Sequence, residues 1–120
     1  MFDKNLNAIQ SLNEISNMEL LGDLIHQINK DLYLSGIDYQ FDLEMGPDLL
    51  VGQMKLILAD LMERHFQKFL SFLYRIDISE EKLRSIGSSD FEHVTNIITF
   101  LILKRQWQKV WFRNRNSQQE

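Results

Sequence analysis

The sequence predicts a mainly α-helical domain with one strand-like segment, and three observations support this. Apolar residues recur with the 3.6-residue period of a helix over three long stretches. Strict alternation of apolar and polar residues occurs in one stretch, residues 37–45. The chain has 120 residues, of which 44% are hydrophobic and 25% charged, a composition typical of one globular domain. We therefore expect a single domain over residues 1–120, with residues 1–15 and 114–120 frayed or disordered.

The first long helix is predicted to begin after Ser16. The spacing of Ser16 and Glu19 fits a capping box, in which the serine and the glutamate satisfy each other's backbone amides. The helix should end near Leu34, because Gly36 can adopt the left-handed conformation that closes a helix. Its apolar stripe consists of Met18, Leu21, Ile25, Ile28 and Leu32.

Residues 37–45 carry the pattern of a half-buried β-strand. One side would carry Ile37, Tyr39, Phe41, Leu43 and Met45, and the other Asp38, Gln40, Asp42 and Glu44. A lone strand leaves its backbone hydrogen-bonding groups unpaired, so it needs a partner. Three arrangements stay open: a hairpin with residues 32–34 (the first helix then ending near Lys30), an extended arm over the helices, or pairing with a second copy of the chain.

The central element is predicted to be one helix over residues 48–76. Pro47 fits its first turn, and only Gly52 disfavours helix within it. Its apolar residues cover a wide arc, so we expect it to contact several neighbours. A short helix should follow, from about Ser79 to Ser85.

The last helix is predicted to run without a break from Asp90 to about Arg113. Ser89 and Glu92 have the spacing of a second capping box. The first half of this helix is apolar and should lie in the core. The fold class is therefore mainly α: three long helices and one short helix packed around the helix at 48–76, plus the extended or strand segment at 37–45.

The charges divide between the two ends of the chain. Residues 1–47 carry eight acidic and two basic residues, whereas residues 104–120 carry five basic residues and one acidic residue. This polarity indicates that the C-terminal end meets something acidic, either the N-terminal half of its own chain or a second copy. Tryptophan and arginine often dominate binding energies at protein interfaces. The predicted partner-binding residues are Trp107, Trp111, Lys104, Arg105, Lys109, Tyr39 and Phe41.

Catalytic and metal chemistry find little support in the sequence. There is no cysteine, and no glycine-rich nucleotide motif or nucleophile elbow occurs. Asp23 and His26, like Asp90 and His93, have the spacing of helical metal sites. However, the first pair lies opposite the apolar stripe and Asp90 lies in a capping turn. We predict no enzyme activity, no cofactor and no metal, with His26 and His93 as the weak metal candidates.

Targeting signals are also lacking. The N-terminal residues show no positive start followed by an apolar run, so no secretory signal is expected. The longest apolar run, residues 97–103, is far shorter than the roughly 20 residues that span a bilayer. We predict a cytoplasmic protein without a membrane span.

Residues 110–115, VWFRNR, are similar to the core of a homeodomain recognition helix. That resemblance implies that Trp111 is buried with Phe112, that Asn114 contacts a base, and that Arg113 and Arg115 touch phosphates. A reading helix also needs a turn before it and a basic arm, and neither is found in this sequence. An amphipathic helix with cations at its C-terminus is the favoured interpretation. Nucleic-acid binding through Arg113, Asn114 and Arg115 is the alternative function.

A second resemblance covers residues 72–83, FLYRIDISEEKL, and 101–113, LILKRQWQKVWFR. This layout looks like that of small bacterial helical proteins, which implies a bacterial, cytosolic protein and no particular activity.

The predicted function is protein–protein interaction, in the form of a homodimer. A heterologous protein partner and a metal-binding bundle follow as further possibilities.

Overall fold

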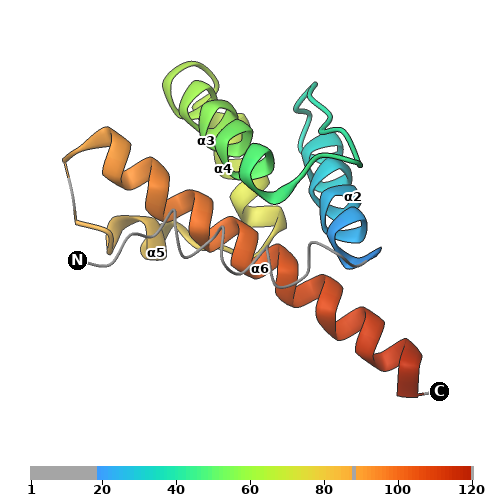
Figure 1. The fold of residues 1–120 in the computed structure, drawn as a ribbon. Coiled ribbons are helices and arrows are strands. Elements are labelled where there is room, and N and C mark those ends of the chain that lie inside the picture. Colours follow the sequence, from blue (N-terminus) through green and yellow to red (C-terminus); the bar gives the residue numbers. More distant parts are fainter. Residues whose placement is uncertain (1–18, 88, 120) are drawn as a thin grey trace.

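The computed structural model of the chain describes residues 19–87 and 89–119, and it confirms the mainly α-helical class. Its helices are α2 (Glu19–Leu34), α3 (Pro47–Arg64), α4 (Phe66–Arg75), α5 (Glu80–Arg84) and α6 (Phe91–Gln119). Helix α6 is a long rod against which α2 and α3 pack, and its C-terminal turns project beyond the other helices (Figure 1). None of the described helices combines the length and apolar content needed to cross a membrane.

Helix α2 ends where the sequence predicts. Gly36 has a φ of +77°, and its N–H donates to the carbonyl of Tyr33 at 3.1 Å. The N–H of Ile37 donates to the carbonyl of Leu32 at 3.0 Å. These two bonds form a Schellman motif, and Leu32 and Ile37 are both buried in the contact that usually accompanies it. The predicted start at Ser16 lies outside the described residues.

The prediction of one helix over residues 48–76 is wrong. Pro47 begins α3 as expected, but His65 adopts a non-helical φ of −139° and ψ of 55°, so α4 starts anew at Phe66. The apolar residues of this segment cover too wide an arc for one straight helix to bury. Helix α3 contacts α4 and α6, and α4 also contacts α2. Two separate helices can therefore each direct their own apolar face into one core.

The strand predicted at residues 37–45 is not supported, because the described residues contain no strand. Ile37, Phe41 and Met45 are buried, whereas Tyr39 and Leu43, on the same side of the predicted strand, are exposed. The segment thus buries one residue in four instead of one in two. It runs irregularly from α2 to α3 and places three apolar side chains in the core.

The backbone of this segment is bound by a side chain instead of by a neighbouring strand. Asn29 Nδ2 donates to the carbonyl of Phe41 at 2.9 Å, and the N–H of Phe41 donates to Asn29 Oδ1 at 2.7 Å. Both groups are buried, so without these bonds they would each lack a partner. Asn29 therefore attaches the segment to α2 and fixes the position of Phe41.

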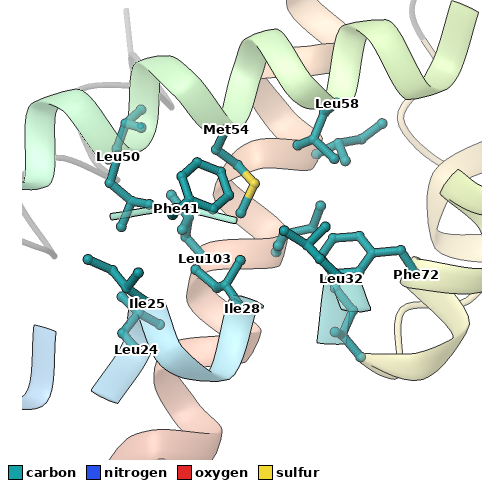
Figure 2. Close-up of a cluster of buried hydrophobic side chains, with 14 of the residues drawn as sticks. Leu24, Ile25, Ile28, Leu32, Phe41, Leu50, Met54, Leu58, Phe72 and Leu103 are labelled. Carbon is teal, nitrogen blue, oxygen red and sulfur yellow. The ribbon is translucent and has the colours of Figure 1, made fainter. Parts of the chain in front are cut away.

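The core gathers side chains from four helices and from this segment. Figure 2 shows residues of α2 facing residues of α3, with Phe41 between them and Phe72 and Leu103 alongside. Burial of this apolar surface is the main force that holds the helices together. The fully buried members with the largest side chains are Phe41, Phe69, Phe72, Leu24, Ile25, Ile28, Leu32, Leu50, Met54, Leu58 and Leu73.

Helix α6 is continuous, as predicted, and has no break between residues 99 and 106. Its N-cap is Asp90 and not the expected Ser89, since Asp90 Oδ1 accepts the N–H of Glu92 at 3.1 Å. The buried hydroxyl of Thr99 donates to the carbonyl of Thr95 at 2.8 Å, four residues earlier. The helix continues past the expected end near Arg113 to Gln119.

Candidate protein-binding surface on the C-terminal helix

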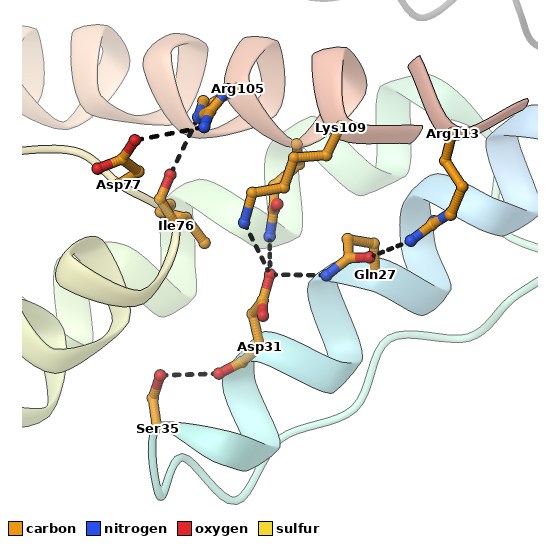
Figure 3. Close-up of polar contacts among 9 residues, drawn as sticks. Gln27, Asp31, Ser35, Ile76, Asp77, Arg105, Lys109 and Arg113 are labelled. Atoms are coloured by element: carbon orange, nitrogen blue, oxygen red, sulfur yellow. Dashed lines mark hydrogen bonds and ion pairs between the residues drawn. The ribbon is translucent and has the colours of Figure 1, made fainter. Parts of the chain in front are cut away.

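The C-terminal half of α6 is attached to α2 by polar side chains around Asp31. Asp31 is only 3% exposed. Its Oδ2 accepts hydrogen bonds from Gln27 Nε2 at 3.0 Å and from Gln106 Nε2 at 2.8 Å. Lys109 Nζ lies 3.8 Å from the same oxygen and forms an ion pair with it (Figure 3). One buried carboxylate thus connects two successive turns of α6 to α2.

Two further cations of α6 also bind groups of their own chain. Arg113 Nη1 donates to Gln27 Oε1 at 2.9 Å, one turn beyond Lys109 (Figure 3). Arg105 Nε donates to the carbonyl of Ile76 at 3.3 Å, and its Nη2 lies 3.4 Å from Asp77 Oδ2. The acidic counterpart of Lys109 is therefore the N-terminal half of the same chain, one of the two alternatives that the charge pattern left open.

Gln106 completes this polar cluster at a cost. Its side chain is fully buried, and its Oε1 is the one buried side-chain polar atom without a hydrogen-bond partner among the described residues. A buried acceptor without a donor destabilises a fold by about 1–3 kcal/mol. The bond from Gln106 to Asp31 offsets part of this cost, and it also fixes which way the amide points.

The aromatic residues at the end of α6 form an exposed pair. Trp111 is 38% exposed and Phe112 is 58% exposed. Their ring centroids are 5.4 Å apart and the ring planes are inclined at 81°, a favourable edge-to-face contact. Trp107 is half-buried and packs against the core. The surface pair is therefore Trp111 with Phe112, and not Trp107 with Trp111 as the sequence suggested.

The other predicted partner-binding residues differ in their exposure. Lys104 is exposed, and its Nζ lies 5.9 Å from the centre of the Phe100 ring. Tyr39 is partly exposed, and its hydroxyl donates to Gln53 Oε1 on α3 at 2.7 Å. Phe41 is 1% exposed, because it fills the core below Tyr39. Phe41 is therefore no longer a candidate for a partner surface.

A groove lies between Tyr39 and the outer face of α3. Its volume is about 340 Å³, and its apolar lining includes Tyr39, Leu56 and Leu61. Leu56 is 72% exposed although it lies in the middle of a helix. Asp38, Asp60, His65 and Lys68 also line the groove, and Asp60 forms an ion pair with Arg64 at 3.4 Å.

The weak metal candidates lie apart in the fold. His26 is exposed on α2 and lines an open hollow of about 470 Å³ with Tyr33 and Tyr39. His93 is exposed in the first turn of α6. Over residues 19–87 and 89–119, no three histidine, cysteine, aspartate or glutamate side chains gather closely enough to hold a metal ion.

The residues of the nucleic-acid alternative lie at the end of α6. Arg113 binds Gln27, and the side chains of Asn114 and Arg115 lie outside the described part of the structure. The turn that the homeodomain resemblance implies before the reading helix is missing, because α6 is continuous.

Sequence reasoning missed Asp31, Gln27 and Gln106. A signal was present, because Gln27 and Asp31 lie one turn apart beside Ile28 and Leu32 in the apolar stripe. Gln106 likewise lies between buried Ile102 and buried Val110. Polar residues at such positions are buried and need partners, although the sequence does not say which.

We compared the chain with protein-family models, with curated proteins and with solved structures, and none of the three comparisons gives a match.

Proposed function

We propose that the protein acts by binding another protein chain through the exposed aromatic end of α6, and that this chain is a second copy of itself. The observation that carries the proposal is the pair Trp111 and Phe112, whose rings contact each other edge to face while remaining partly exposed. Large aromatic side chains supply much of the binding energy at protein interfaces. Their contact with each other also restricts their rotamers before a partner arrives.

The attachment of α6 supports the same proposal. Lys109 and Arg113 bind α2 on either side of Trp111 in the sequence, which holds this part of the helix against the core. A binding element that is already held in place loses less entropy on association than a mobile one. The end of α6 thus combines partly exposed aromatic area with a fixed position.

Nucleic-acid binding is the less favoured function. Affinity for nucleic acids depends mainly on cations that neutralise phosphates. Arg105 and Lys109 already pair with Asp77 and Asp31 of the same chain. A phosphate would have to compete with these carboxylates. We propose no catalytic activity, and a bacterial, cytoplasmic protein stays a prediction from the sequence.

Light scattering coupled to size exclusion, over a series of protein concentrations, tests the proposal. We expect a dimer or larger assembly that dissociates on dilution. Phe112→Ala should weaken association by about 30-fold, since removing an interface aromatic costs about 2 kcal/mol or more. Tyr74→Ala is the matched control, because Tyr74 is a strongly exposed aromatic residue on α4. A wild-type chain that stays monomeric at every concentration would refute self-association.

A further inference from the structure

We infer that the aromatic end of α6 inserts into the groove between Tyr39 and α3 of a second copy of the chain. This inference rests on the proposed function and names the surface that receives Trp111 and Phe112. The acceptor groove is defined here by Asp38, Tyr39, Leu56, Asp60 and Leu61.

The shape and exposure of the acceptor groove suit an aromatic side chain. It has a volume of about 340 Å³ and is open to solvent on one side. Leu56 is 72% exposed at its edge, and Leu49, two turns earlier on α3, is 53% exposed. A helix that presents leucines to solvent along one face leaves apolar area that association can bury.

Opposite charges favour the same pairing. Residues 37–68, which include every residue that lines the groove, carry six acidic residues and three basic residues. One of these bases, Arg64, forms an exposed ion pair with Asp60. Residues 104–113 of α6 carry four basic residues and no acidic residue. Even with Asp31 and Asp77 set against Lys109 and Arg105, this part of α6 has more positive than negative charge. Such complementarity speeds encounter and fixes which surfaces meet.

The contact has to form between two chains. The C-terminal end of α6 projects beyond the other helices, on the side of the molecule away from α3 (Figure 1). Within this end, Arg113 binds Gln27 and Lys109 binds Asp31, both on α2. The end of α6 is thus bound to α2, and no described residue of α6 lines the acceptor groove of its own chain. A second copy therefore has to supply the aromatic end that enters the groove.

A complementation experiment tests the inference. Phe112→Ala disables the α6 end and keeps the groove, whereas Leu56→Lys disables the groove and keeps the α6 end. Because Leu56 is mostly exposed, Leu56→Lys should fold normally, which circular dichroism checks. We expect each variant alone to associate at least tenfold more weakly than the wild type. A mixture of the two, with one labelled by a fluorophore and followed by sedimentation velocity, should restore association, because one intact contact can form.

The outcomes separate the inference from the proposed function. If Phe112→Ala weakens association and Leu56→Lys behaves as the wild type, the α6 end binds elsewhere and the groove is wrong. If both variants weaken association but their mixture does not recover it, the two surfaces do not bind each other and the inference also fails. Tyr74→Lys, on α4 and outside the groove, is the matched control for an added lysine. A monomeric wild type removes both the proposed function and the inference.

Discussion

Replacing Asp31 by alanine tests the polar cluster that attaches α6 to α2. The carboxylate of Asp31 is buried and accepts two amide hydrogen bonds, from Gln27 at 3.0 Å and from Gln106 at 2.8 Å. Alanine removes this acceptor and leaves both amide groups in place. The substitution therefore measures what the cluster contributes to the free energy of unfolding.

The magnitude follows from the burial of each partner. Gln106 is fully buried and Gln27 nearly so, and a buried donor without an acceptor costs about 1–3 kcal/mol. Lys109, with 27% of its side chain exposed, can turn to water and adds little. Asp31 lies in the last turn of α2, where the helix dipole disfavours negative charge, so its loss restores about 0.3–1 kcal/mol. We expect Asp31→Ala to lower the free energy of unfolding by about 2–4 kcal/mol.

Urea denaturation followed by circular dichroism measures this loss through the shift of the midpoint at constant slope. Asp31→Asn should lower the free energy of unfolding by less, about 1–2 kcal/mol, because the carbonyl oxygen of asparagine can still accept a hydrogen bond from one of the two glutamine amides. Asp23→Ala is the control on the same helix: Asp23 is exposed, so the change should stay within about 0.5 kcal/mol. If Asp31→Ala is as stable as Asp23→Ala, the buried cluster does not hold α6 to α2.

Two further predictions concern the backbone. Asn29→Ala leaves the buried N–H and C=O of Phe41 without partners and should destabilise the fold by about 2–4 kcal/mol in the same urea assay. A loss below that of an exposed-site control would contradict the role of Asn29. Asp77 has a φ of +70°, which costs a side chain about 1–2 kcal/mol. Its ion pair with Arg105 is weak, because the Asp77 side chain is 83% exposed. Asp77→Gly should therefore melt at least about 4 °C higher than Asp77→Ala. Equal melting temperatures of the glycine and alanine variants would show that this backbone position is not strained.

The helical class, the C-terminal end of α2 and the start of α3 could be predicted because local chemistry decides them. Gly36 closes α2 and Pro47 opens α3 through their own backbone preferences, without help from distant residues. The break at His65 could not be predicted in this way, since neither glycine nor proline marks it. The wide apolar arc was the available indication, because one straight helix cannot direct such an arc into a single core.

The error at residues 37–45 has a tertiary cause. Alternation is evidence for a strand only if the backbone finds a neighbouring strand to bind. Here Asn29, twelve residues away on α2, binds the N–H and C=O of Phe41 and takes the place of that neighbour. The sequence shows a polar residue at position 29 but not what it faces. The exposed side chains of Tyr39 and Leu43 follow from this arrangement.

The candidate surface was predicted only in part, because tertiary packing again decides what the sequence does not show. The helical period places Trp107 and Trp111 on one face, but it does not say which of them the core covers. That depends on how α6 packs against the other helices, which buries Val110 and leaves Phe112 exposed. The charge pattern left pairing within the chain as one of two alternatives, and the choice of Asp31 as the partner of Lys109 depended on the packing of α2.

The buried polar cluster and the proposed binding surface are connected by the register of α6. A contact made only of apolar side chains stabilises two helices, but it permits a slip of one turn because one aliphatic residue can replace another. Asp31 binds both Gln106 and Lys109, so a slip would leave buried polar groups without partners. Apolar replacements of such clusters often equal or exceed them in stability, and the best-attested role of buried polarity is to fix register. Trp111 and Phe112 follow Lys109 on the same continuous helix, so the contact that fixes Lys109 also fixes them. We therefore expect changes at Asp31 to weaken association as well as stability, although Asp31 itself is buried and touches no partner.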